Sequence, residues 1–178
     1  MQAGVRACLA VAASLAAAVA LAGPAAAAGS RPAAHLSALE AGVLTQINNV
    51  RQAHGLAALR LSVTLSAAAV QHSAEMGRDG YFAHESFDHS AFWKRVQRYY
   101  PSTGYRNWSV GENLLWSSPD VDPPRAVTMW MNSPEHRANL LNPAWREIGL
   151  SGLHLDAAPG AYGGQAVTIL TADFGARR

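Results

Sequence analysis

The chain has 178 residues, of which 49% are hydrophobic and 15% charged, and its formal net charge is +2. This length predicts one domain, and the apolar fraction is sufficient for a core of ordinary size. The small net charge and the scattered arginines argue against a protein that binds nucleic acid.

The first 28 residues have the pattern of a cleavable secretory signal peptide. Arg6 supplies a positive charge, residues 7–22 are apolar, and three alanines ending at Ala28 resemble a cleavage site. An uncleaved membrane anchor is the alternative, although the apolar stretch is short for one. The only cysteine, Cys8, would leave with the signal, so the mature protein would have no disulfide. We therefore expect a secreted protein without a membrane span, with a linker at 29–35 and one domain at 36–178.

Apolar spacing, capping residues and prolines predict a series of helices before residue 143. They are expected at 36–54, from Ser62 or Thr64 to residues 77–80, between Ser90 and Pro101, from Pro123 onwards and, as a short helix, at 133–142. Two segments rich in strand-forming residues follow at 147–155 and 166–174, with a glycine turn at 160–164 between them. Helices followed by strands favour an α+β fold with a mostly antiparallel sheet covered by helices.

Three histidines stand near acidic or apolar residues. His72 lies on the apolar stripe of the second helix, where a hydrogen-bonded core histidine is the expected interpretation. His84 and His89 flank Glu85, but this spacing is one residue longer than the zinc-protease helix requires, so that class is excluded.

Glu112 precedes an apolar run, in the sequence Gly-Glu-Asn-Leu. A carboxylate among hydrophobic side chains needs a partner, because an unpaired buried charge is costly, and a histidine would satisfy it. His136 follows Glu135 at the start of the short helix. Two imidazoles with one or two carboxylates would suit a divalent metal such as Zn²⁺, or a hydrogen-bonded cluster without metal. The sequence contains no nucleophile elbow, phosphate loop or dinucleotide fingerprint.

Several short motifs together resemble one family over residues 38–176. They are Asn48–Arg51, Leu65–Ala69 leading to His72–Met76, Tyr81–His84, Gly111–Leu114, Trp130–Leu141, Glu147–Gly149 and Thr171–Gly175. Their order and gaps resemble the bacterial branch of the CAP superfamily (SCP or pathogenesis-related-1-like domains). The resemblance implies a three-layer α-β-α sandwich with a central cleft.

In this family two histidines and two acidic residues line the cleft. The resemblance carries these positions to His84, Glu112 and His136. Glu135 is the candidate for the second carboxylate, because Ser133 stands where animal and plant members have a glutamate. The histidine motif and disulfides of eukaryotic members are also missing from this sequence.

CAP proteins share a fold without sharing one established chemistry, so the fold does not name a reaction. We expect a module that binds a hydrophobic or cell-envelope ligand in the cleft, with or without Zn²⁺ at His84, Glu112 and His136. One alternative is a metal-assisted hydrolase with Glu112 or His84 as the catalytic residue. The other is a structural or interaction protein of the cell envelope.

Overall fold

A computed structural model describes residues 36–178 of the protein, and the expected signal peptide and linker lie outside these residues. The helices are α1 (Ala38–Ala53), α2 (Val63–Asp79), α3 (Phe92–Tyr99), α4 (Pro123–Asn132) and α5 (Pro134–Leu140). The strands are β1 (Arg60–Leu61), β2 (Trp108–Ser117), β3 (Glu147–Leu155) and β4 (Val167–Arg177).

The four strands form one sheet in the order β1-β3-β4-β2. The β3–β4 and β4–β2 pairs are antiparallel, whereas the two-residue strand β1 runs parallel to β3. In the β2–β4 ladder Glu112 lies directly opposite Asp173. The predicted, mostly antiparallel sheet is therefore confirmed, and its register places two acidic residues side by side.

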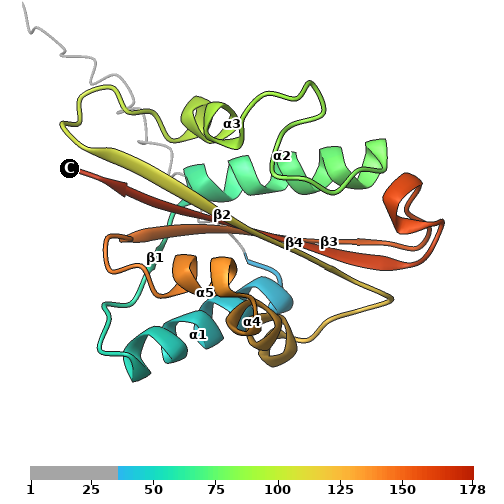
Figure 1. The fold of residues 1–178 in the computed structure, drawn as a ribbon, viewed down its shortest axis with the longest axis horizontal. Coiled ribbons are helices and arrows are strands. Elements are labelled where there is room, and N and C mark those ends of the chain that lie inside the picture. Colours follow the sequence, from blue (N-terminus) through green and yellow to red (C-terminus); the bar gives the residue numbers. More distant parts are fainter. Residues whose placement is uncertain (1–35) are drawn as a thin grey trace, which may run out of the picture. The chain divides into compact units, whose positions relative to one another are not determined.

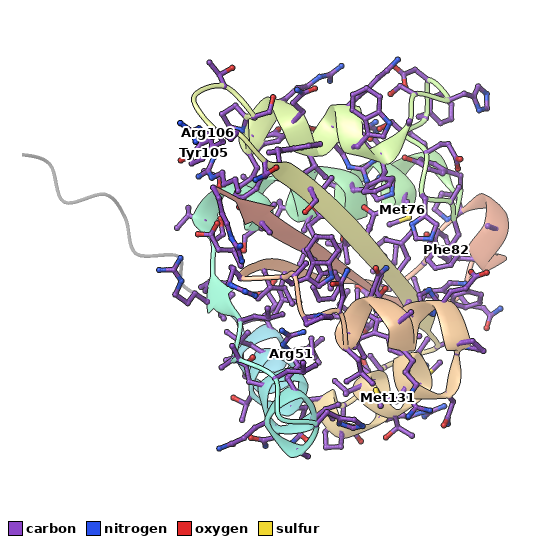
Figure 2. The ribbon with its side chains drawn as sticks, turned by 60° about the vertical axis from the view of Figure 1, so that its left-hand side comes forward. Arg51, Met76, Phe82, Tyr105, Arg106 and Met131 are labelled. Carbon is purple, nitrogen blue, oxygen red and sulfur yellow. The ribbon has the colours of Figure 1, made fainter. Side chains whose placement is uncertain are left out.

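Helices cover both faces of this sheet (Figure 1). Helices α2 and α3 lie on one face, and α1, α4 and α5 lie on the other (Figure 1). Met76 of α2 packs in the first layer and Met131 of α4 packs in the second (Figure 2). This arrangement confirms the expected three-layer α-β-α sandwich.

Local signals explain most helix boundaries. Ser37 caps α1 in a capping box with Glu40, and the Asp122 side chain accepts a hydrogen bond from the first turn of α4. Helix α2 ends at Gly80, whose φ of 69° suits a left-handed C-cap. Helix α3 begins one residue later than expected, after Ala91 rather than Ser90.

Arg51 connects α1 to the short helix α5, which lies in the same layer (Figure 1). Its side chain is fully buried, and Nη1 donates to the backbone oxygens of Leu140 at 2.8 Å and Asn142 at 3.1 Å (Figure 2). Carbonyls at a helix C-terminus carry partial negative charge, so a guanidinium is a favourable partner there. Arg51 thus fixes the end of the helix that carries His136.

Candidate functional site

Glu112 is the centre of a buried cluster between the sheet and α3. It lies in the middle of β2 and is 4% exposed. Its Oε1 accepts a hydrogen bond from Nδ1 of His84 at 2.8 Å, and its Oε2 accepts one from the Arg95 guanidinium. Because an ionised carboxylate only accepts hydrogen bonds, the Nδ1 atom of His84 carries the proton and Nε2 is the remaining nitrogen.

The pKa values of this pair move in opposite directions. Burial alone would raise the pKa of Glu112, but the hydrogen bond from His84 and the charge of Arg95 lower it below its usual value. The hydrogen bond to Glu112 raises the pKa of His84, against the smaller effect of its partial burial. The His84 side chain is 49% exposed, so the pair has a buried carboxylate and an accessible imidazole.

Arg95 connects the carboxylate to the loop at 81–91. The residue is 1% exposed on α3, and its Nη1 donates to Oγ of Ser86 at 3.0 Å and to the backbone oxygen of His84 at 3.4 Å. The sequence interpretation did not include Arg95. Its place on the stripe formed by Phe92, Val96 and Tyr99 was the available signal, since these positions share one helix face.

Asp173 is the acidic side chain beside Glu112. It is fully buried on β4, and neither of its oxygens has a hydrogen-bond donor among residues 36–178. Burial raises the pKa of Asp173 well above its ordinary value, and the negative charge of Glu112 raises it further. This shift favours the neutral carboxylic acid form of Asp173 beside the ionised Glu112.

Glu135, the sequence candidate for the second carboxylate, is exposed at the start of α5. No hydrogen bond or ion pair joins it to Glu112 or His84 within the described part of the chain. The carboxyl that the fold brings to Glu112 is Asp173. The motif Thr171–Gly175 resembles the family pattern, but only the β2–β4 register identifies its aspartate as a neighbour of Glu112.

Two further histidines lie near this cluster. His72 is fully buried, as its place on the apolar stripe predicts, and its Nε2 lies 2.9 Å from the Ala83 backbone oxygen and 3.9 Å from Glu112 Oε1. Burial lowers the pKa of His72. His136 is half-buried on α5, and its pKa is lowered by burial and then by the charge of His84. The two predicted cleft histidines are thus close enough to affect each other's protonation.

Asparagines fix α5 against β2 at the cleft. Nδ2 of Asn113 donates to the backbone oxygen of His136 at 3.0 Å. Nδ2 of Asn139 donates to the backbone oxygen of Glu112 at 3.1 Å and to Oδ1 of Asn113 at 3.0 Å. A cleft of about 380 Å³ opens here, lined by His84, Phe92, Val110, Gly111, Glu112 and Asn139.

The expected three-residue zinc site is not assembled. Within residues 36–178 no group of three or more His, Cys, Asp or Glu side chains has an arrangement that could hold a metal ion. Both oxygens of Glu112 are already engaged by His84 and Arg95. Glu112 therefore fits the role of a carboxylate behind an imidazole better than the role of a metal ligand.

Among residues 36–178 no helix is both long enough and apolar enough to cross a membrane.

Comparisons with known proteins agree with this architecture. Two Bacillus subtilis proteins are similar to this chain in sequence. The uncharacterized protein YkwD is 34% identical over 115 residues, which are 65% of this chain and 42% of YkwD. The uncharacterized membrane protein YlbC is 32% identical over 112 residues, which are 62% of this chain and 30% of YlbC. The matched part is thus less than half of either relative.

Two bacterial proteins with solved structures have the same fold. An extracellular SCP-domain protein of Bacillus anthracis matches with a TM-score of 0.56 and 29% identity, covering 76% of this chain and 40% of that chain. An outer surface protein of Borrelia burgdorferi matches with a TM-score of 0.60 and 24% identity, covering 76% and 90%, and shows the fold alone. The sequence profile named "CAP: Cysteine-rich secretory protein family" matches residues 44–153, more than half of the chain. The chain therefore belongs to the CAP family, with a domain of the bacterial type.

Proposed function

We propose that this protein is a secreted binding module that holds an amphiphilic ligand in the His84 cleft. The observation that carries the proposal is the His84–Glu112 pair: the buried carboxylate orients the imidazole and leaves the half-exposed ring at the cleft wall. Export is supported by the signal-like residues 1–28 and by similar structures described as extracellular and outer-surface proteins.

The cleft lining favours an anionic or hydrogen-bond-accepting head on an apolar body. The raised pKa of His84 keeps this imidazole protonated to a higher pH than an ordinary histidine. Arg95 and Glu112 neutralise each other, so a protonated His84 leaves the cluster with a net positive charge at the cleft. Phe92 and Val110 supply apolar surface for the rest of such a ligand.

The two alternatives that depend on Glu112 have less support. A general base must be free to accept a proton, and both Glu112 oxygens already accept hydrogen bonds in a site almost closed to solvent. A zinc centre would rest on His84 and His136 alone, fewer than the three protein ligands of a usual catalytic zinc.

Calorimetry with two probes tests the proposal. We expect decanoate to bind saturably and one-to-one, and we expect His84→Ala to abolish this binding. The matched control is His154→Ala, because His154 is 47% exposed on β3 and does not line the cleft. Zinc binding that is lost in both His84→Ala and His136→Ala would instead indicate a metal cleft. If neither probe binds and His84→Ala only lowers stability, the cluster is structural and the proposal is wrong.

A further inference from the structure

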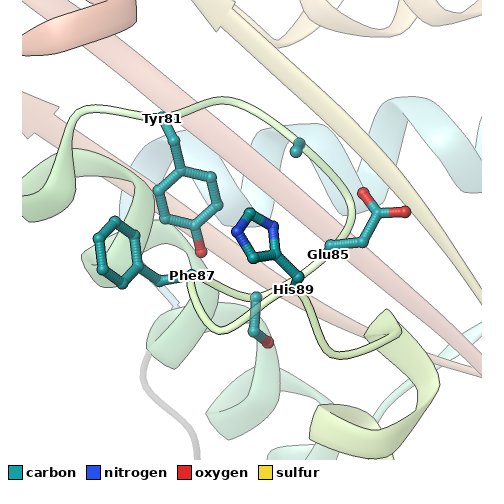
Figure 3. A pocket seen from close by; sticks show the side chains of 6 residues that line it. Tyr81, Glu85, Phe87 and His89 are labelled. Atoms are coloured by element: carbon teal, nitrogen blue, oxygen red, sulfur yellow. The ribbon is translucent and has the colours of Figure 1, made fainter.

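A second cavity of about 380 Å³ lies in the loop between α2 and α3. Its lining residues are Tyr81, Ala83, Glu85, Ser86, Phe87 and His89, several of which gather around the curve of the loop in Figure 3. The cleft at His84 and this loop cavity share no lining residue. The loop cavity is therefore a separate candidate site, which the proposed function does not use.

The walls of the loop cavity are formed in advance. The Tyr81 and Phe87 rings lie 5.8 Å apart at an interplanar angle of 50°. Ser86 and Ser90 close the turn through a backbone hydrogen bond of 3.0 Å, and His89 within it has a φ of 60°, in the left-handed region. Since Arg95 also donates to Ser86, the turn is anchored to the core, and little ordering would be required when a ligand binds.

Two aromatic side chains, Tyr81 and Phe87, line the cavity. Phe87 is 61% exposed. The Tyr81 ring contacts Phe87 and also lies near the buried His72, with 6.1 Å between the Tyr81 and His72 ring centroids. The face of an aromatic ring carries partial negative charge and attracts cations within about 6 Å. An exposed phenylalanine over a preformed hollow is thus suited to a ligand that carries a positive charge on an apolar body.

The charges around the cavity are mainly negative. Glu85 lines it, and Glu75 and Asp79 act on Tyr81, whose pKa rises to about 12, first through burial and then through the charge of Glu75. Arg78 pairs with Asp79. Within residues 36–178, Glu75 and Glu85 form no ion pair with an arginine or a lysine, and the charge of Glu85 also acts on His84.

The nearby arginines are engaged elsewhere, and the basic side chain that lines the cavity is the His89 imidazole (Figure 3). Arg95 binds Glu112, and the charge of Arg98 acts on Asp88, the remaining acidic residue of the turn. An anionic ligand would meet the carboxylate of Glu85 at the cavity wall, whereas a cation would be attracted by it.

We propose that the loop cavity binds the ammonium group of a small ligand, with Phe87 and Tyr81 as its aromatic walls and Glu85 as its counter-charge. The chemistry is that of a cation–π site, in which the ring faces and one carboxylate replace part of the water around the ammonium.

Choline and its neutral isostere 3,3-dimethyl-1-butanol test this proposal on the whole protein. The two probes have the same shape and differ in charge, and NMR titration at pH 8 keeps ordinary histidines neutral. We expect choline to bind about fivefold more tightly or better, which corresponds to the usual strength of a cation–π contact, with shifts confined to the 81–90 loop. Equal affinity for the two probes, or no binding of choline, would overturn the proposal.

Two substitutions and one control locate the site. Phe87→Ala should remove choline binding, and Glu85→Gln should weaken it severalfold while the neutral alcohol is unaffected. Phe82→Ala is the matched control, because Phe82 is an exposed phenylalanine of the same loop that does not line the cavity (Figure 2). If choline binds equally well to Phe87→Ala and to Phe82→Ala, the assignment to this cavity is wrong.

An ammonium group can come from a free amine or from a lipid headgroup. Sedimentation with phosphatidylcholine vesicles separates the two sources. Choline binding without vesicle binding assigns a free amine, and loss of both in Phe87→Ala assigns a headgroup. If the natural protein does not bind choline, and its vesicle binding persists in Phe87→Ala, the loop cavity is not the binding site.

Discussion

Asp173→Asn is the perturbation that examines the buried cluster most closely. Asparagine has nearly the shape of a protonated aspartic acid, and its amide can donate a hydrogen bond as a carboxylic acid can. In the folded protein Asp173 has no exposed surface and faces the charge of Glu112, with Arg95 as the one opposing cation. In the unfolded chain the same aspartate ionises with a pKa of about 3.9.

The consequence is a loss of stability as the pH rises. The folded state holds a proton on Asp173 that the unfolded state releases, so the free energy of unfolding falls by about 1.4 kcal/mol per pH unit above pH 4, until the raised folded pKa is reached. The asparagine side chain of the variant cannot titrate, so the substitution removes this slope. The variant should therefore gain stability relative to the natural protein as the pH rises from 5, until the raised pKa of folded Asp173 is reached.

Urea unfolding of both proteins at several pH values measures the difference. His84, His72, His136 and Glu112 also contribute to the pH dependence, but they are present in both proteins and largely cancel. Parallel stability curves would mean that Asp173 is ionised in the folded state. A variant several kcal/mol less stable at every pH would mean that a carboxylate is required there, and either result would refute the reasoning.

Three further outcomes are expected. Glu112→Gln leaves the buried Arg95 and the half-buried His84 without their carboxylate, and it should lower the free energy of unfolding by about 3–5 kcal/mol. Urea unfolding measures this loss, and a value below about 1 kcal/mol, as for exposed pairs, would contradict the buried pairing. Gly149→Ala would place Cβ 2.0 Å from the α2 backbone, whereas at Gly152 the nearest atom is a side-chain carbon at 3.1 Å. Thermal unfolding should therefore show a much larger loss for Gly149→Ala than for Gly152→Ala, and equal losses would be inconsistent with this packing. In a proton NMR titration His84 should have a pKa above the ordinary value of about 6.5 and His136 one below it, and the reverse order would exclude the described hydrogen bond and burial.

The sequence patterns predict the helices better than the sheet. Apolar spacing and caps locate α1, α2 and α4 to within a few residues, since each buries one stripe and begins at a recognisable residue. Strand β2 was not predicted, although it carries Glu112. Residues 111–115 are all buried, so this strand lacks the alternation that identifies a half-exposed strand. Strand β1 is only two residues long and has no pattern of its own.

The candidate site could be predicted only where one residue requires a partner. A carboxylate among apolar residues requires a counter-charge, and the structure supplies His84 to Glu112. Asp173 could not be found by the same reasoning, because its closeness to Glu112 depends on the register of β2 against β4. Zinc coordination by Glu112 was a reasonable expectation from residue types, but the hydrogen bond from Arg95 occupies the oxygen that a metal would need.

The central claim is that the hydrogen bond from Nδ1 of His84 to Glu112 leaves the Nε2 atom of the imidazole available to a ligand. Long-range ¹H–¹⁵N NMR of the histidine rings, recorded with and without decanoate, tests it most directly. We expect a proton on Nδ1 of His84 and, without decanoate at high pH, an Nε2 atom with the shift of an unprotonated nitrogen. Added decanoate should move the Nε2 signal towards that of a protonated nitrogen, because a carboxylate accepts a hydrogen bond from it. A proton on Nε2 in the free protein, or an unchanged His84 signal at saturating decanoate, would contradict it.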